Sequence, residues 1–332
     1  MDSEIVHLIY DLAIVARVTW QAHSLSNAGN NGSNRILPRR QLLANGVLTD
    51  ACHGNITKHE HAGLLAEYFQ AWDVPLCPAC AQRDGRRVAA LIDTPEYRGV
   101  TIERILRECG LCDSHGFLVP AKNPNSDGSS AGRQKINKDT ILNFSFALAL
   151  PDHYAESEHL ITRMGNSKEE GQMLMKVPAR SGVYAACVQY MGVRVGVDTK
   201  HWQVVVEDDE RRRRHQAILS CLRDALLSPQ GAMTGTMLPH LTGLSGAVVI
   251  RPTVGRAPLY SVMAEDFEEQ LQGLAKGTSQ IIPFATVSQF QEVMDHLIKT
   301  TEPAKPGKDN TQKLAGVRSV TGSGMMPEEL EE

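Results

Sequence analysis

The sequence lacks the features that would mark a membrane or secreted protein. No apolar run is long enough to cross a bilayer. The first four residues, Met-Asp-Ser-Glu, are acidic where a signal peptide would be basic. We therefore expect a cytoplasmic protein with no membrane partner. Aromatic residues make up only 5% of the 332 residues, but 42% are hydrophobic, which is enough to build one large core or two smaller ones.

The sequence also lacks the common signatures of enzymes. There is no G-x-S-x-G, no Walker phosphate loop, and no carboxylate pair with an obvious partner. The stretch LTGLSGAV resembles a glycine turn, but no helix and ribose-binding acid follow it as in a dinucleotide site. The motifs therefore predict no catalysis.

An excess of positive charge is missing as well, since the net charge is -4. This total is unevenly distributed, because residues 302–332 carry six acids against four bases and account for half of it. Residues 17–60 have the opposite bias, with Asp50 and Glu60 facing five bases: Arg17, Arg35, Arg39, Arg40 and Lys58. Local charge decides where a phosphate backbone can lie, so the composition permits a nucleic-acid partner.

Four of the seven cysteines form two pairs, Cys77-Pro-Ala-Cys80 and Cys109-Gly-Leu-Cys112. Two such knuckles can place four thiolates around a structural zinc ion, which leaves no open position for catalysis. The segment TIERILREC between them is helical in pattern, and His115 could replace one ligand. The alternative is four reduced cysteines packed as small apolar residues, as we expect for Cys52, Cys187 and Cys221.

The order of elements predicts an α+β fold of the ferredoxin-like βαββαβ type. Strands are expected at 5–22, 141–150, 182–197 and 246–252, and helices at 58–72, 209–228, 266–275 and 287–300. The core would comprise residues 1–72, 136–150 and 182–300. Two insertions interrupt it, at 73–135 and at 151–181, the second polar and irregular. Residues 301–332 read as a disordered tail, and Arg211 to Arg214 as a solvated helix face.

Two further segments could bind anions. The stretch from Asn27 to Arg40, NAGNNGSNRILPRR, offers flexible glycines and the forked donors of Arg35, Arg39 and Arg40. Lys58 lies beside a helix start, where backbone N–H groups can hold an anion. The plainer interpretations are a solvated turn and a polar, well-capped helix start. His59 and His61 are two residues apart, so they do not share a helix face as a metal pair would.

Taken in order, these segments resemble the backbone subunit of CRISPR Cascade complexes, the DevR-type branch of the RAMP superfamily. The resemblance covers roughly residues 1–265. It rests on the first strand leading into NNGSNRILPRR, the helix start GNITKHEHA, the core split by a long insertion, and the closing strand LPHLTGLSGAVVIRP. No single motif is a fingerprint; the ordered set carries the resemblance.

The resemblance implies a hand-shaped protein with a ferredoxin-like palm, a zinc-bearing finger insertion (73–135) and a thumb insertion (151–181). Copies would stack head to tail along a crRNA and present it for pairing with target DNA, together with other Cascade subunits, in antiviral defence. The implied RNA contacts are Asn31, Arg35, Arg39, Arg40, Lys58, His59, Arg163, Met164, Lys176 and Arg180. The implied zinc ligands are Cys77, Cys80, Cys109 and Cys112.

Relatives that cut target RNA use an acid in the loop after the first strand, where this chain has Asn27, Asn30, Asn31 and Asn34. The resemblance therefore implies a binding subunit rather than an enzyme. Two alternatives stay open. One is a metal-dependent RNA endonuclease of the same superfamily, using His53, His59, His61 or Asp50. The other is a zinc-containing transcriptional regulator, although we find no helix-turn-helix pattern.

Overall fold

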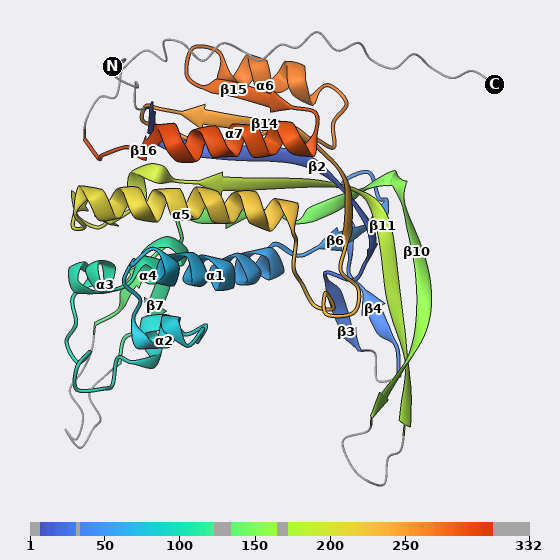
Figure 1. Ribbon diagram of the computed structural model, residues 1–332, viewed down its shortest axis with the longest axis horizontal. Helices are drawn as coiled ribbons and strands as arrows, with labels where there is room; N and C mark the ends of the chain where they lie inside the picture. The colour runs from blue at the N-terminus through green and yellow to red at the C-terminus, as the bar shows by residue number, and fades with distance from the viewer. Residues whose placement is uncertain (1–6, 31–33, 123–133, 165–171, 308–332) are drawn as a thin grey trace.

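The computed structural model describes residues 7–30, 34–122, 134–164 and 172–307. Figure 1 shows a palm of helices and strands from which two parts project on the same side. One projection is the first insertion, and the other is the long hairpin of β10 and β11. The molecule has the outline of an arch.

The palm is built on one antiparallel sheet. The strands follow each other in the order β15 (Gln280–Phe284), β14 (His240–Arg251), β2 (Asp11–His23), β11 (Gln172–Tyr190), β10 (Ala147–Met164), β6 (Leu48–Cys52) and β5 (Arg40–Leu42). The short β9 (Leu142–Phe144) pairs with β11 as well, just before the chain continues into β10. β2 lies at the centre, paired along most of its length with β11 on one side and β14 on the other.

The connections confirm the predicted ferredoxin-like arrangement. From β2 the chain passes through α1 (Gly54–Ala71) to β9 and β10, turns into β11, and passes through α5 (Asp208–Leu227) to β14. The resulting neighbours β14, β2, β11 and β10 form the split βαβ order. The sequence did not predict β15, which adds an edge strand beside β14, or the β5–β6 hairpin at the opposite edge.

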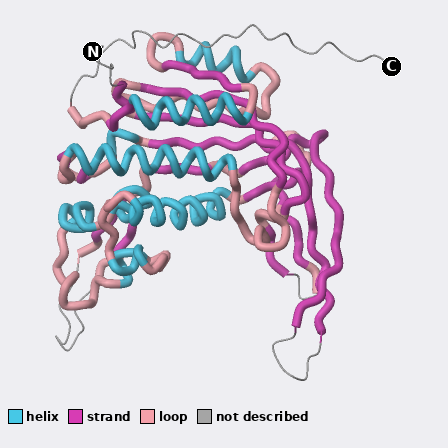
Figure 2. Tube along the Cα trace, viewed as in Figure 1, coloured by secondary structure: helices cyan, strands magenta, loops and turns pink. Residues whose placement is uncertain are grey.

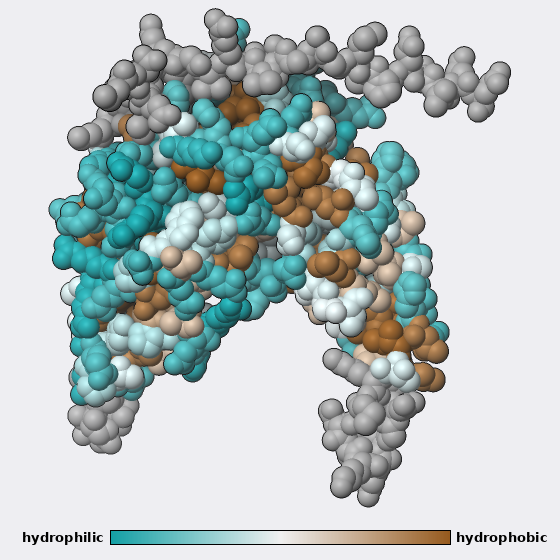
Figure 3. Space-filling view, in the orientation of Figure 1, coloured by the Kyte–Doolittle hydropathy of each residue, from teal (hydrophilic) through white to brown (hydrophobic). Residues whose placement is uncertain are grey.

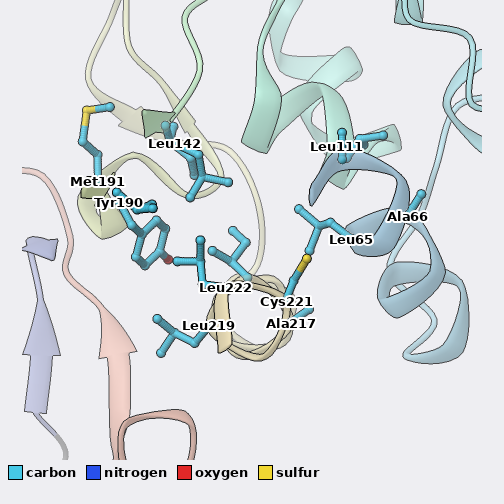
Figure 4. Packing of buried hydrophobic residues seen from close by; sticks show 14 of the residues in the cluster. Leu65, Ala66, Leu111, Leu142, Tyr190, Met191, Ala217, Leu219, Cys221 and Leu222 are labelled. Carbon is cyan, nitrogen blue, oxygen red and sulfur yellow. The ribbon is translucent and has the colours of Figure 1, made fainter. Parts of the chain in front are cut away.

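Both faces of the sheet are covered. The helices α1, α5 and α7 (Val287–Thr300) lie on one face, in front of the strands in Figure 2, and their apolar side chains share a core with Leu12, Ile14, Ala16 and Val18 of β2. In Figure 4, α5 places Leu219 and Leu222 toward Tyr190, and Cys221 toward Leu65 of α1. The other face of β2, with Ala13 and Val15, is covered by α6 (Phe267–Ala275) and the preceding loop. Both faces of β2 are therefore buried.

The first insertion consists of short elements: α2 (Pro78–Ala81), η1 (Arg87–Ala90), α3 (Ile102–Glu108), α4 (Gly110–His115), β7 (Phe117–Val119) and β8 (Ile136–Lys138). α3 confirms the helix expected between the cysteine pairs. The apolar residues of the insertion, among them Val88, Ile105 and Leu111, belong to the same hydrophobic core as those of the palm. The insertion is thus packed onto the palm as part of one core.

The second insertion is not the irregular segment that we expected. β10 and β11 form a ladder that is continuous from Tyr154 opposite Gly182 to Met164 opposite Gln172. An irregularity in register between Ala149 and Tyr154 separates this projecting part from the part inside the sheet. The small hairpin of β3 (Asn27–Asn30) and β4 (Ile36–Pro38) lies beside it, where Arg35 forms a bridge with Lys176.

Residues 301–307, which we had assigned to a disordered tail, belong to the fold. β16 (Thr301–Pro303) pairs in parallel with β1 (His7–Ile9), and Ala304 is buried. Residues 308–332 lie outside the described residues. The remaining elements are η2 (Gly192–Arg194), β12 (Val197–Asp198) and β13 (Gln203–Val204).

Arg211 and Arg214 are not on a solvated face, as we had predicted, but buried. Arg211 donates to the carbonyls of Val195 and Ala304, at 2.8 Å each. Arg214 donates to the carbonyl of Leu106 at 2.8 Å. The run of charges in the sequence did not indicate that these two arginines are buried with hydrogen-bond acceptors.

Candidate metal centre and nucleic-acid interface

The two cysteine pairs converge. Cys77 precedes α2, Cys80 lies within it, and Cys109 and Cys112 lie at the start of α4. All four sulfur atoms are within 4.8 Å of one another, and all four residues are buried. The Cys112 Sγ is 3.7 Å from the Cys80 Sγ and 4.0 Å from the Cys77 Sγ. The edges of a tetrahedron with Zn–S bonds of ~2.3 Å are about 3.8 Å long, so the spacing fits a four-thiolate ion site.

The electrostatics of the cluster suit a cation. Burial opposes ionisation of Cys109, but hydrogen bonds from Cys112, Cys77 and Cys80 hold the pKa of this thiol well below its usual value. The backbone N–H of Cys112 also points at the Cys109 Sγ, 3.3 Å away. A bound metal ion would stabilise the thiolate that this buried cluster already favours at Cys109. His115 is not part of this group; its Nε2 is 3.0 Å from the Nδ1 of His61.

A buried ionic cluster fastens the cysteine site to the palm. Asp113, directly after Cys112, forms ion pairs with Lys138 of β8 and with Arg214 of α5, the latter at 3.0 Å. It also accepts a hydrogen bond from the N–H of Gly196 at 2.8 Å. All three charged side chains are 0% exposed. Removing one partner from such a group would leave the other charges uncompensated in a low-dielectric interior. The ion pairs therefore hold the cysteine cluster in a fixed position relative to α5.

On the other projection, two of the predicted RNA contacts lie side by side. Arg35 and Lys176 both form ion pairs with Glu158, at 2.6 and 3.3 Å. Their side chains stay 50% and 57% exposed. Because two cations share one carboxylate, this surface keeps a net positive charge. The N–H of Lys176 also donates to the carbonyl of Asn34 at 2.7 Å, which fixes the two strands edge to edge.

Arg40 and Arg39 lie nearer the base of the hairpin. Arg40 pairs with Glu156 at 2.6 Å and donates to the Tyr154 hydroxyl at 3.3 Å. Arg39 is half-buried and donates to the carbonyl of Asn27 at 2.9 Å. Glu156 and Glu158, which balance these arginines, were not singled out from the sequence. They alternate along β10 with Ser157, a pattern that in hindsight marks one face of a strand.

Arg180 does not belong to this surface. Its side chain is 0% exposed and pairs with Asp50, itself 0% exposed, at 3.4 Å. The prediction that Arg180 contacts RNA was therefore wrong, because the side chain points into the base of the hairpin rather than to solvent. Of the other predicted contacts, Asn31 lies outside the described residues. Arg163 and Met164 lie on β10, but their side chains are not described.

Lys58 and His59 occupy the first turns of α1. His53 caps this helix by accepting a hydrogen bond from the N–H of Asn55 at 2.9 Å, as a polar helix start requires. Burial and the nearby charge of Arg87 lower the pKa of Lys58. Arg87, from the first insertion, had not been predicted. The two cations form a positively charged site near the junction of α1 and the finger.

A family model described as "CRISPR-associated negative auto-regulator DevR/Csa2" matches residues 14–269. The chain belongs to this family. The match spans the central strand, both insertions and the last palm strand, so the ordered set of segments, rather than one motif, identified the family from sequence.

Two solved structures are similar to this chain over most of its length. They are titled "CRISPR RNA-guided surveillance complex" and "CRISPR RNA-guided surveillance complex, pre-nicking". Each aligns over 87% of this chain and 98% of its own, at 10% identity, with TM-scores of 0.47 and 0.45. No curated protein matches the sequence. Within the described residues of the DevR/Csa2 chain, no helix is both long and apolar enough to cross a membrane.

Proposed function

We propose that this DevR/Csa2 chain is a non-catalytic subunit of a CRISPR surveillance complex that holds guide RNA by its backbone. Arg35 and Lys176, exposed side by side on the hairpin and sharing one carboxylate, carry the proposal. Lys58 and Arg87 provide a second positive site near the finger. Figure 3 shows the surface hollowed between the two projections. Cations at these two sites would neutralise phosphates without reading bases, leaving sequence recognition to pairing between the guide and target DNA.

The subunit would act in the cytoplasm, in several copies along one RNA and together with other subunits of the complex. We further propose that Cys77, Cys80, Cys109 and Cys112 bind Zn²⁺ as a structural ion. Four sulfur ligands leave no position for a catalytic water, so the ion would supply folding free energy to the insertion. Because Cys112 is followed by Asp113, which pairs with Arg214 of α5, the ion would also stabilise the contact between the insertion and α5.

Of the residues considered for a nuclease, His59 is exposed, but the surroundings of the other three argue against that alternative. Asp50 is 0% exposed and paired with Arg180, and His61 is buried against His115. His53 caps α1 through its own ring nitrogen. Neither buried side chain can reach a phosphodiester in this fold.

RNA binding is tested directly with the purified protein. Short RNA should copurify with it, and the affinity for single-stranded RNA of unrelated sequences should be similar and should fall steeply with salt. RNA-free protein whose weak binding ignores ionic strength would refute the proposal. Divalent-metal-dependent cleavage of RNA by the pure protein would refute its non-catalytic part.

A further inference from the structure

A groove of about 320 Å³ lies between α1 and the end of α5, apart from the basic surfaces described above. Its floor is formed mainly by apolar side chains of the sheet, among them Trp20, Phe144 and Val188. The wall on α1 is one face of the helix, because its lining residues recur at intervals of three or four: Ile56, Glu60, Gly63, Leu64 and Glu67. The proposed RNA and metal sites do not include this groove.

Gly63 opens the wall of the groove. It lies in the interior of α1, where glycine is less favourable for helix stability than alanine. A Cβ added to Gly63 would meet no atom within 4 Å, so no packing contact within the described residues requires a glycine here. The missing side chain instead lets another segment approach the backbone of α1 closely.

A buried donor on the floor favours a peptide as the occupant. Trp20 is 6% exposed, and its indole Nε1 has no hydrogen-bond partner among the described residues. A buried N–H without an acceptor is unfavourable. An extended peptide brings one carbonyl oxygen per residue and can supply an acceptor, whereas a purely aliphatic ligand cannot.

The rim of the groove is acidic. Glu67 is paired with Arg83, and Asp224 with Arg223. Glu60 is half-buried and has no ion-pair partner among the residues that the structure describes. The floor therefore suits aliphatic side chains, and the carboxylate of Glu60 suits a cation next to them.

The chain carries such a segment after its last described residue. Residues 313–320 read KLAGVRSV, with two cations, no acid and three large aliphatic side chains, those of Leu314, Val317 and Val320. The composition of this stretch therefore matches both the floor and the rim of the groove.

The other segments outside the described residues lack this combination. Residues 123–133 and 165–171 contain no Val, Ile, Leu or Met. Residues 1–6 contain two acids but no Lys or Arg, and the last five residues, EELEE, would be repelled by the acidic rim.

The segment is long enough to reach the groove of its own chain. Lys305 forms an ion pair with Asp208, the first residue of α5. The groove lies at the other end of this helix, near Leu226, about 27 Å away at 1.5 Å per residue. An extended chain that starts at Lys305 covers about 30–50 Å over residues 314–320. The segment can therefore enter the groove while Lys305 stays in place.

We propose that residues 313–320 dock in the α1–α5 groove of the same chain. Leu314 and Val317 lie on the apolar floor, and the cations Lys313 and Arg318 flank Glu60. Because the segment is tethered, its effective concentration at the groove is high, and a weak contact is enough to keep the groove covered. The contact needs neither RNA nor a second copy, so it goes beyond the proposed function.

Trypsin measures the docking, because it cleaves after Arg318 only when that residue has left the groove. Gly63→Trp fills the groove from within α1 and should speed this cleavage about tenfold or more, since burial of an aliphatic side chain is lost. Gly273→Trp is the matched control and should be cleaved like the wild type, since Gly273 also lies inside a helix, α6, and its added Cβ likewise meets nothing within 4 Å. Leu314→Ser/Val317→Ser leaves the groove intact and should speed cleavage as Gly63→Trp does. Equal rates in the wild type and in both altered chains would overturn the proposal.

A photo-crosslinking residue in place of Ser319 identifies what the segment touches. The full chain is used as an equal mixture of ordinary and ¹⁵N-labelled protein, without RNA. Crosslinks from position 319 to residues 56–67 that never join an ordinary to a labelled chain support the proposal. Crosslinks between the two kinds of chain, or to another surface, would contradict it. Both experiments are independent of RNA binding, so they judge the groove whether or not the proposed function holds.

Discussion

Asp50 and Arg180 form an ion pair in which both side chains are completely buried, with Oδ1 and Nη1 3.4 Å apart. Tyr184 donates to the second carboxylate oxygen at 2.7 Å, and the Nε2 of His23 is 2.9 Å from the Tyr184 hydroxyl. These residues come from β2, β6 and β11. The pair therefore fixes the base of the projecting hairpin to the palm, and through the hairpin it sets the position of Lys176.

Replacing Asp50 by Ala should destabilise the protein by about 3–5 kcal/mol, because Arg180 is left as an uncompensated buried charge. Urea unfolding measures the loss. The double variant Asp50→Asn/Arg180→Met should recover most of it, since no charge is stranded. Glu158→Ala, which removes the acid of an exposed ion pair, should cost less than about 1 kcal/mol. Equal losses for Asp50→Ala and Glu158→Ala would contradict the role of the buried pair.

The exposed cations of the hairpin should act on RNA affinity without affecting folding. Arg35→Ala/Lys176→Ala should weaken single-stranded RNA binding and lower the slope of log affinity against log salt by about 1.4, as two phosphate contacts are lost. Fluorescence anisotropy at several salt concentrations gives this slope. Lys276→Ala, at an exposed lysine after α6, is the control and should leave both quantities unchanged. A lower affinity with an unaltered slope would mean that the two side chains do not bind phosphates.

Metal content distinguishes a four-cysteine zinc site from four reduced cysteines that are simply packed in the core. Cys77→Ser should remove close to one zinc ion per chain, as measured by plasma mass spectrometry, and should make the first insertion sensitive to proteolysis. Cys187→Ser, outside the cluster, should leave the zinc content unaltered. A chelator should lower the Tm of the wild type but not of Cys77→Ser. Equal zinc in both cysteine variants would exclude the assignment.

Acid should destabilise the fold through His215. Its Nδ1 is 2.7 Å from the Tyr190 hydroxyl, and its Nε2 is 2.9 Å from the Thr301 hydroxyl. Thr301 donates its own proton to the Leu297 carbonyl. It must therefore accept from Nε2, and in the neutral ring Nδ1 accepts from the Tyr190 hydroxyl. Burial, assisted by Arg211, lowers the pKa of His215 to about 3.

A histidine with a lowered pKa stabilises the fold fully above its unfolded pKa of about 6.5, and this contribution is lost as the pH falls toward 3. The loss is about 1.4 kcal/mol for each pH unit. His215→Gln should therefore flatten the dependence of unfolding free energy on pH between 6.5 and 4 by that amount. A variant with the wild-type slope would show that His215 does not titrate on unfolding.

Short local patterns were sufficient to predict the palm strands and the cluster of four cysteines. The alternation of apolar residues gave the central strand, and the two cysteine knuckles predicted the cluster whose sulfurs lie together. The hairpin escaped prediction because residues 156–159 are exposed and polar, so the projecting part of β10 shows no alternation of apolar and polar residues.

The buried arginines could not be predicted for a different reason. Arg214 pairs with Glu210 on its own helix, but its second acid, Asp113, lies 101 residues earlier in the chain, and the partner of Arg180 is Asp50 on another strand. A charged side chain can be buried at an acceptable cost only when it is paired. No local sequence pattern reveals a partner so far away in the chain. Arg180 was therefore assigned to the surface together with Lys176.

The central position of β2 has a consequence for biosynthesis. β2 leaves the ribosome first but obtains its two neighbours only with β11 and β14, and β14 ends at Arg251, about 230 residues after His23. At roughly 5–20 residues per second, about 10–50 s pass before both hydrogen-bonding edges of this very apolar strand can be satisfied. Nascent chains stalled before β14 should for that reason recruit chaperones and aggregate, which makes completion of the message the step that commits the protein to its native sheet.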